Sequence, residues 1–118
     1  MAAVCCTNKN PEPYEYRVGF AYPDELSFNE DTATGDPIDI SADDFELVIK
    51  DSTGTVIDTL TLGDVSTDGL EYVAPNKLKQ LIGSPTTDIA GTYTADLIIT
   101  EPDGGHYPLY TRKIIVKP

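Results

Sequence analysis

Tryptophan is absent from the 118-residue sequence, histidine occurs once, and eight basic residues stand against twenty acidic ones. The formal net charge is −12. Proteins that bind nucleic acids or anionic membranes rely on Lys and Arg to neutralise phosphate groups, so this charge argues against both partner classes. With no Trp and with His106 as its one histidine, the sequence also offers few of the side chains that catalytic sites most often use.

Cysteine is almost as scarce, because Cys5 and Cys6 are the two in the chain and they are adjacent. A disulfide between neighbours joins no distant segments, so it would not stabilise the fold. A zinc site within one chain would need more ligands than these two thiols and the distant His106. We expect reduced thiols and predict no metal or cofactor. Metal binding and cross-linking to a neighbouring subunit are the alternatives.

Long apolar runs are also missing. No stretch reaches the roughly 20 residues that a membrane-spanning helix needs. The first ten residues lack the basic start and the apolar segment of a secretory signal. We therefore expect the chain to be made and folded in the cytoplasm.

The chain begins with a polar segment that precedes the patterned part of the sequence. Residues 1–13 show neither helical nor strand periodicity, and Pro11 and Pro13 fix φ and remove hydrogen-bond donors, so an extended arm is expected. The arm is either a loose terminus or a segment that lies on a partner, and we favour the partner. Residues 14–118 are then one domain. The candidate interface residues are Cys5, Cys6, Pro11, Pro13, Tyr14 and Tyr16.

The clearest pattern in the domain is strict alternation over residues 91–100. The apolar positions of this segment are Tyr93, Ala95, Leu97 and Ile99. A period of two predicts a strand with one face on a core and the other toward water. Turn residues follow at 102–105, and a second apolar run follows at 109–116. Together they predict a central hairpin.

Shorter apolar runs predict the remaining strands. The segments are 14–22, which breaks at Pro23 and resumes at 26–28, and then 37–40, 45–50, 55–62 and 70–73. The first is expected at a sheet edge, and a turn at 51–54 is expected to join 45–50 to 55–62. About seven short strands in a chain of this length predict a two-sheet β-sandwich.

The inward faces of two strands can also be predicted. In the 45–50 strand they are Phe45, Leu47 and Ile49, and in the 55–62 strand they are Val56, Leu60 and Leu62. One short helix is predicted at residues 75–82. Leu78, Leu81 and Ile82 share a helical face there, with Pro75 in the first turn and Gly83 after the last.

An acidic stretch from Val18 to Ile49 contains no Lys or Arg. Its carboxylates are Asp24, Glu25, Glu30, Asp31, Asp36, Asp39, Asp43, Asp44 and Glu46. The stretch is interpreted as a solvated surface, with a docking face for a basic partner or a Ca²⁺ site as alternatives. No segment has the spaced acidic pattern of a calcium-binding loop.

Catalysis is not predicted. The carboxylates lie in turns, and His106 follows two glycines in a predicted turn. Acid–base chemistry needs such groups fixed across a cleft. Several tyrosines lie in the first and last strands, where they serve either packing or an interface: Tyr14, Tyr16, Tyr22, Tyr107 and Tyr110. Without Trp, they make a weak platform for sugars.

The order of motifs resembles that of small virion proteins of tailed bacteriophages. The matching residues are Gly35, Pro37, Ile38, Asp39, Ile40, Phe45 to Lys50, Gly54 to Leu62, Leu78, Leu81, Gly91, Tyr93, Asp96, Leu97, Asp103 and Gly104. The resemblance covers about residues 35 to 117 and rests on the order of common elements. It implies an immunoglobulin-like sandwich that serves as a capsid decoration protein or as an anchoring domain of a baseplate protein.

The expected function is therefore mechanical. The chain is expected to be a virion protein that decorates and cements the capsid, in contact with major capsid or tail proteins and with other copies of itself. One alternative is a tail or baseplate adaptor that seats a fibre or receptor-binding protein. Another is a surface adhesin or carbohydrate-binding module.

Overall fold

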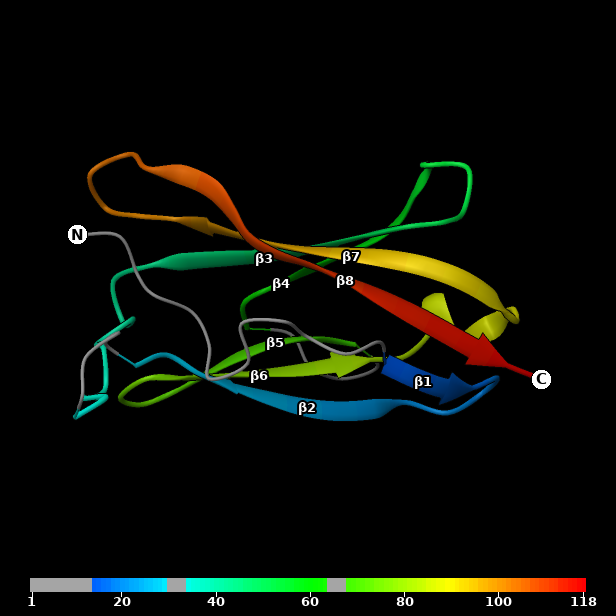
Figure 1. Cartoon of the computed structure of the whole chain (residues 1–118), viewed down its shortest axis with the longest axis horizontal. Helices are drawn as coiled ribbons and strands as arrows, with labels where there is room; N and C mark the ends of the chain where they lie inside the picture. The colour runs from blue at the N-terminus through cyan, green and yellow to red at the C-terminus, as the bar shows by residue number, and fades with distance from the viewer. Residues whose placement is uncertain (1–13, 30–33, 64–67) are drawn as a thin grey trace.

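The computed structural model describes residues 14–29, 34–63 and 68–118, which form two facing β-sheets (Figure 1). The strands are β1 (Tyr14–Arg17), β2 (Tyr22–Ser27), β3 (Asp44–Lys50), β4 (Val56–Thr61), β5 (Gly69–Val73), β6 (Lys77–Ile82), β7 (Gly91–Thr100) and β8 (His106–Lys117). A 3-10 turn, η1 (Thr86–Asp88), lies between β6 and β7. Within the described ranges, no helix has the length and apolar character needed to cross a membrane.

The strand order is that of an immunoglobulin-like sandwich. The larger sheet has the order β1-β8-β7-β3-β4, and the smaller has the order β2-β6-β5. Variable-type immunoglobulin domains extend their G-F-C sheet by a C′ strand, and β8, β7, β3 and β4 occupy these four places. β1 pairs with β8 in parallel, and the other pairs are antiparallel. The predicted β-sandwich is confirmed.

The core lies between the sheets and is built on the β7–β8 hairpin. Alternate β7 residues from Tyr93 to Ile99 are buried, as are Phe45, Leu47 and Ile49 of β3. Leu47 and Leu97 are direct partners across the two strands, and each is 1% exposed or less. The central hairpin and the inward face of β3 are thus confirmed, and burial of these side chains stabilises the fold by about 25 cal/mol per Å² of apolar surface.

The helix predicted at residues 75–82 is wrong, because Lys77–Ile82 is strand β6. Leu78, Gln80 and Ile82 are all buried on one face, which is a period of two. β6 is the central strand of the smaller sheet and pairs with both β2 and β5, so tertiary pairing overrides the weak helical pattern.

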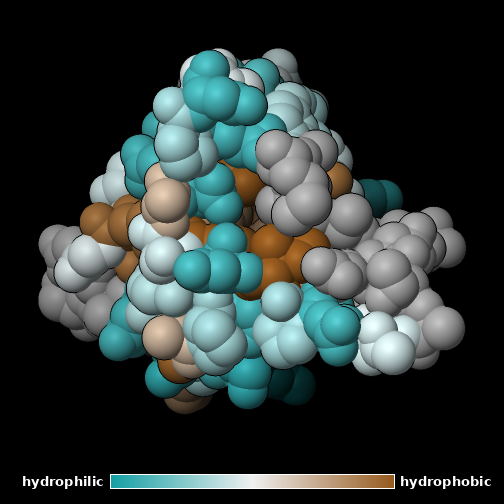
Figure 2. Space-filling model, turned by 90° about the vertical axis from the view of Figure 1, so that its left-hand side faces the viewer, coloured by the Kyte–Doolittle hydropathy of each residue, from teal (hydrophilic) through white to brown (hydrophobic). Residues whose placement is uncertain are grey.

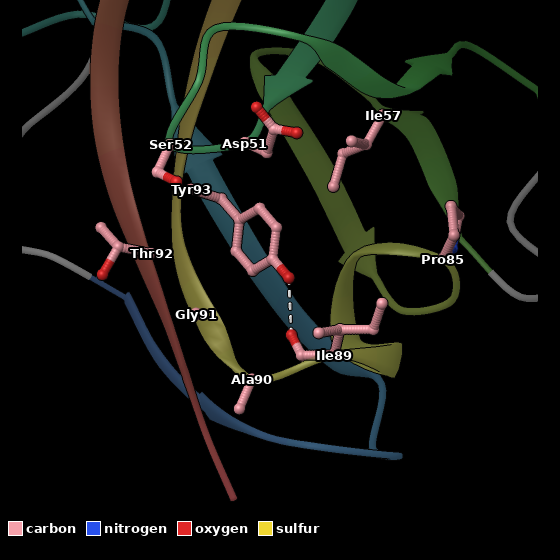
Figure 3. Close-up of a pocket in the computed structure, with 9 residues that line it drawn as sticks. All are labelled: Asp51, Ser52, Ile57, Pro85, Ile89, Ala90, Gly91, Thr92 and Tyr93. Atoms are coloured by element: carbon pink, nitrogen blue, oxygen red, sulfur yellow. Dashed lines mark hydrogen bonds between the residues drawn. The ribbon is translucent and has the colours of Figure 1, made fainter.

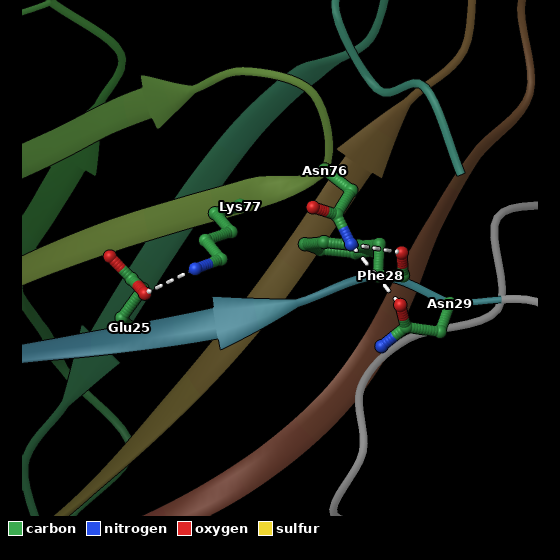
Figure 4. Close-up of polar contacts among 5 residues, drawn as sticks. All are labelled: Glu25, Phe28, Asn29, Asn76 and Lys77. Carbon is green, nitrogen blue, oxygen red and sulfur yellow. Dashed lines mark hydrogen bonds and ion pairs between the residues drawn. The ribbon is translucent and has the colours of Figure 1, made fainter. Parts of the chain in front are cut away.

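Contacts at the start of β6 hold it against β2 (Figure 4). The Nδ2 atom of Asn76 donates 2.9 Å to the carbonyl oxygen of Phe28 and 3.2 Å to Oδ1 of Asn29. The backbone N–H of Phe28 in turn donates 2.9 Å to the carbonyl oxygen of Asn76. The Nζ atom of Lys77 lies 3.4 Å from Oε1 of Glu25 on β2. The end of β2 and the β5–β6 turn are therefore joined.

Three other boundaries differ from the predictions. The first strand divides into β1 and β2 at a turn where Gly19 has a φ of +87°. Pro23 lies within β2 and does not end it, since β2 is an edge strand where a missing donor is tolerated. Residues 37–40 form only an isolated bridge at Pro37, although Ile38 and Ile40 are buried as a strand would bury them.

The strand predicted at 55–62 forms as β4, but its expected inward face is only partly correct. Leu60 is buried, whereas Val56 is 52% exposed. The register shifts between Ile49 and Lys50, so that Ile49 faces Asp58 and Lys50 faces Val56. Such a bulge places one extra residue in β4, which turns the start of the strand outward.

Candidate functional site

Four of the six candidate interface residues, Cys5, Cys6, Pro11 and Pro13, lie outside the described residues. Tyr14 and Tyr16 are both on β1, where their rings stack with centroids 5.5 Å apart. Tyr14 is partly buried, and Tyr16 is only 6% exposed within the core. The Tyr16 side chain thus offers little area to a partner, and the proposed role of the arm stays a prediction.

Tyr14 belongs to a polar cluster that joins the two sheets. The guanidinium of Arg112 on β8 lies 4.0 Å from the centre of the Tyr14 ring, and its Nη1 lies 3.5 Å from Oδ2 of Asp24 on β2. The Tyr14 hydroxyl donates to the same Asp24 oxygen. These contacts hold β1 in place and serve the fold.

The exposed hydrophobic side chains gather at one end of the sandwich, which we call the apolar end. Within the described ranges, the large hydrophobic side chains that are exposed are Phe20 (61%), Val56 (52%) and Ile89 (70%). They come from the β1–β2 turn, the start of β4 and the segment after η1. The N–H of Gly19 donates 2.9 Å to the carbonyl oxygen of Thr87, which ties the first of these turns to η1. All three segments lie at the right-hand end of Figure 1, with the β3–β4 turn at the top and the η1 segment and the β1–β2 turn below it.

A hollow of about 370 Å³ opens at the apolar end (Figure 3). Its lining comes from the β3–β4 turn, β4 and the segment that leads into β7: Asp51, Ser52, Ile57, Pro85, Ile89, Ala90, Gly91, Thr92 and Tyr93. The ring of Tyr93 forms part of the wall, and its hydroxyl donates 2.6 Å to the carbonyl oxygen of Ile89. Burial, followed by the carboxylates of Asp51 and Asp88, raises the pKa of Tyr93, so the phenol remains a donor at neutral pH.

This tyrosine contact is a known feature of immunoglobulin-like domains. Their tyrosine corner places a Tyr near the start of strand F, two residues before the second Cys, with its hydroxyl bonded to the backbone a few residues upstream. Tyr93 stands two residues before Ala95 on β7 and bonds four residues back. The bond fixes the segment that presents Ile89.

The acidic residue of this hollow is committed to the turn that carries it. The Oδ1 atom of Asp51 accepts from Thr53 N at 2.9 Å, from Thr53 Oγ1 at 2.6 Å and from Thr55 N at 3.0 Å. The hydroxyl of Thr53 and the N–H of Thr55 are the largest of the contacts that lower the pKa of Asp51. His106, the one histidine, bonds Thr100 near the β7–β8 turn and is not part of the hollow.

The opposite end of the sandwich carries carboxylates, and we call it the acidic end (Figure 2). A hollow of about 320 Å³ lies there between the β2–β3 link and the β7–β8 turn. Asp39, Asp43, Glu101 and Asp103 contribute to its lining, together with the almost buried Ile38. Figure 2 shows mainly hydrophilic residues around hydrophobic ones at the centre of this end.

The carboxylates of the acidic end repel one another. Partial burial raises the pKa of Asp43, and the charges of Glu101, Asp39 and Asp103 raise it further. Asp39 differs, because its hydrogen bonds from Ser41 lower its pKa. Among the described residues, no group of three or more His, Cys, Asp or Glu side chains is arranged to hold a metal ion. A basic group on a partner would relieve this repulsion.

The apolar end was not predicted from the sequence. Phe20, Val56 and Ile89 are far apart in the chain, and each stands in or beside a turn where periodicity carries no information. The Pro-rich and Gly-rich character of these segments predicts turns but not that they meet. Two residues of the acidic end, Asp39 and Asp43, do belong to the acidic stretch singled out above, and the fold adds Glu101 and Asp103 to them.

No family model matches the sequence, and no curated protein matches it closely. Solved structures similar to this chain include murine CRIg, with 12% identity and a TM-score of 0.48 over 92% of this chain and 94% of that one. The ZIG-8 IG1 homodimer has 11% identity and a TM-score of 0.46, over 96% of this chain and 86% of that one. Dpr1 IG1 bound to DIP-eta IG1 has 9% identity and a TM-score of 0.43, over 89% of this chain and 88% of that one. The immunoglobulin-like assignment rests on the strand order described above.

Proposed function

We propose that this protein is a binding module without catalytic activity, which docks on a partner protein through its apolar end and turns its acidic end to solvent. The observation that carries the proposal is the hollow with the exposed Ile89 in its lining, at the end of the sandwich where the exposed Phe20 and Val56 also occur. Exposed hydrophobic groups collected on one face mark sites of protein interaction, and scattered ones do not.

The hollow itself favours binding over chemistry. Asp51 is occupied by the turn, and the hydroxyl of Ser52 has no histidine near it in the lining of the hollow. The apolar walls formed by Ile57, Ile89 and the Tyr93 ring suit an aliphatic or aromatic side chain of a partner. Such anchors in pockets supply much of the affinity of protein interfaces.

The acidic end supports the same orientation. Crowded carboxylates keep a surface hydrated and make neighbouring copies repel one another there. We assign the partner to a bacteriophage capsid, on the basis of the sequence resemblance, with the chain as a decoration protein. The N-terminal residues 1–13 would then add contacts along the shell, and symmetric repetition would multiply weak contacts into avidity.

A second candidate is the tail or baseplate adaptor, and the acidic end favours it if the partner surface there is basic. The number of copies per particle separates the two assignments. Decoration requires hundreds of copies in purified virions, whereas an adaptor occurs in multiples of three or six. An adhesin or carbohydrate-binding module would instead show measurable affinity for glycans.

Two single substitutions test the docking surface. Ile89→Asp places a charge at the apolar end, and Ala42→Lys adds a positive charge among the carboxylates of the acidic end, where Ala42 is exposed. We expect Ile89→Asp to weaken binding to particles by about thirtyfold or more, the effect of losing one hot spot of about 2 kcal/mol. Ala42→Lys is expected to bind as the wild type does.

The opposite result would place the docking surface at the acidic end. Circular dichroism of both variants controls for folding, since each position is exposed. Deletion of residues 1–13 is a separate test: it should weaken particle binding and leave the circular dichroism of the domain unchanged. A truncated protein that saturates particles at the same concentration would exclude a role for the arm.

A further inference from the structure

The open side of the sandwich, where β4 and β5 meet, brings two aspartates together. β4 is the edge of the larger sheet, and β5 is the edge of the smaller one. An isolated bridge joins Leu62 and Leu70, and the N–H of Gly63 donates 2.9 Å to the carbonyl oxygen of Leu70. Asp58 on β4 and Asp68, just before β5, lie beside this connection.

Asp58 points toward the core face of its strand. It is paired with Ile49, whose side chain is 0% exposed, and it precedes the buried Leu60 by two residues. Its Oδ1 accepts 2.9 Å from the N–H of Thr59. Its Oδ2 is buried and accepts no hydrogen bond from the protein, and the same is true of Oδ2 of Asp68. Two carboxylate oxygens that have lost water and gained no donor are unfavourable when ionised.

A proton shared between the two groups removes this cost. With a proton on one carboxyl, Asp58 and Asp68 form a hydrogen bond, and the like charges are reduced to one. Burial is the first cause that raises the pKa of Asp58 to about 7, and the hydrogen bond and charge of Asp68 follow. Paired carboxyl groups in other proteins share a proton for the same reasons.

Other charged groups around β4 are directed elsewhere. Lys50 of β3 lies on the outer face, where its Nζ is 3.6 Å from Oδ2 of Asp96. On β5, Glu71 is exposed and stands opposite Lys79 of β6. Within the described ranges, the titratable group that faces Asp58 across the seam is therefore Asp68.

We propose that Asp58 and Asp68 form a proton-dependent clasp between the edges of the two sheets, closed while Asp58 carries a proton and open once Asp58 is ionised. As pH rises, the proton of Asp58 leaves to solvent and the two side chains repel each other across the seam. The connection between Gly63 and Leu70 then loosens while the central hairpin stays intact. Val56 and Ile57 precede Asp58 on β4. Opening of the clasp would therefore also weaken docking at the apolar end, a consequence that rests on the proposed function.

Amide hydrogen exchange of the isolated protein tests the clasp without any partner. After correction for intrinsic rates, we expect protection of the Gly63 amide to fall by about tenfold between pH 6 and pH 8, as linkage requires for one proton released near neutrality. The amide of Leu97, in the central hairpin, exchanges only through larger openings and should stay more protected than that of Gly63 at both pH values. In the Asp58→Asn variant, the Gly63 amide should have the same protection at pH 6 and at pH 8.

Asp44→Asn is the matched control. Asp44 also accepts a hydrogen bond of 2.9 Å from the N–H of the next residue, Phe45, but its side chain is exposed. It should retain the pH dependence of the wild type. The carboxyl ¹³C shift of Asp58, followed in the wild-type protein, gives a second readout that needs no variant. Two results would overturn the proposal. One is a titration of Asp58 that is complete below pH 5. The other is a pH dependence of Gly63 protection that is equal in Asp58→Asn and the wild type.

Discussion

The hydroxyl of Tyr93 donates a 2.6 Å hydrogen bond to the carbonyl oxygen of Ile89, so a residue of the core fixes the most exposed large hydrophobic residue among those described. Tyr93 is 8% exposed, whereas Ile89 is 70% exposed. The bond spans only four residues, yet it joins the interior of β7 to the surface of the apolar end. The core therefore positions the segment that we propose for docking.

Removal of this bond should weaken both stability and docking. We expect Tyr93→Phe to lower the free energy of unfolding by about 1 kcal/mol, the usual net value of one hydrogen bond. Urea denaturation measures the change. Tyr72→Phe is a suitable control, because the Tyr72 hydroxyl makes a longer, exposed bond of 3.3 Å to the carbonyl oxygen of Pro75. Equal effects of the two substitutions would contradict a special role for Tyr93.

The inward face of β7 gives a second prediction. Leu97 is 0% exposed, and its replacement by Ala should lower the free energy of unfolding by about 2–5 kcal/mol through lost burial and the cavity left behind. The neighbouring Ile98 is only partly buried on the outer face, so Ile98→Ala should cost clearly less. Thermal or urea unfolding of both variants makes the comparison, and a larger effect at Ile98 would mean that the faces are reversed.

The Arg112 cluster gives a third prediction. Arg112→Met removes the charge that pairs with Asp24 and lies over the ring of Tyr14, while it keeps much of the side-chain volume. We expect a loss of about 1–3 kcal/mol, since the Arg112 side chain is 7% exposed and its contacts are partly desolvated. Lys113 is exposed on the same strand, and Lys113→Met should be nearly neutral. A neutral Arg112→Met would show that the cluster does not hold β1.

The acidic end predicts opposite pH effects at two neighbouring aspartates. The folded-state pKa of Asp43 is raised above its ordinary value of 3.8, so this group stabilises the fold at low pH, and that stabilisation is lost as pH rises. Asp43→Asn should therefore raise the melting temperature at pH 7 and have little effect near pH 3.

For Asp39 the sign is reversed. Hydrogen bonds from Ser41 lower its pKa, so its stabilisation is present above the ordinary value of 3.8 and is lost as pH falls. Asp39→Asn should lower the melting temperature at pH 7 and not at low pH. Melting curves of the two variants across this range provide the measurement. If both variants had a higher melting temperature than the wild type at pH 7, general charge repulsion at the acidic end would outweigh the hydrogen bonds from Ser41 to Asp39.

The segments that could be predicted from the sequence are those where one pattern fits one structure. Residues 91–100 alternate over their whole length, and burial in β7 follows that alternation residue by residue. β6 could not be predicted, because its apolar residues Leu78, Leu81 and Ile82 have a helical spacing, while the inward face of the strand includes the polar Gln80. Only the pairing of β6 with two neighbours decides between helix and strand, and that pairing is not written in the local sequence.

The candidate sites were harder to predict than the fold. The acidic end could be predicted in part, since Asp39 and Asp43 lie in a stretch without basic residues. The apolar end depends on where three turns meet, and the outward position of Val56 depends on a bulge in β4. Neither follows from residue spacing, because both arise from how distant segments are brought together.

The parallel pairing of β1 with β8 has a practical consequence for anyone who attaches a reporter to this protein. Lys117 pairs with Arg17, and its carbonyl oxygen accepts 2.9 Å from the N–H of Val18, so β8 finishes beside the β1–β2 turn that carries Phe20. A fluorescent protein or affinity tag fused after Pro118 would therefore emerge among the side chains proposed to meet the partner and would obstruct them. Labels inserted at the β7–β8 turn, on the far end of the molecule, would leave that surface accessible.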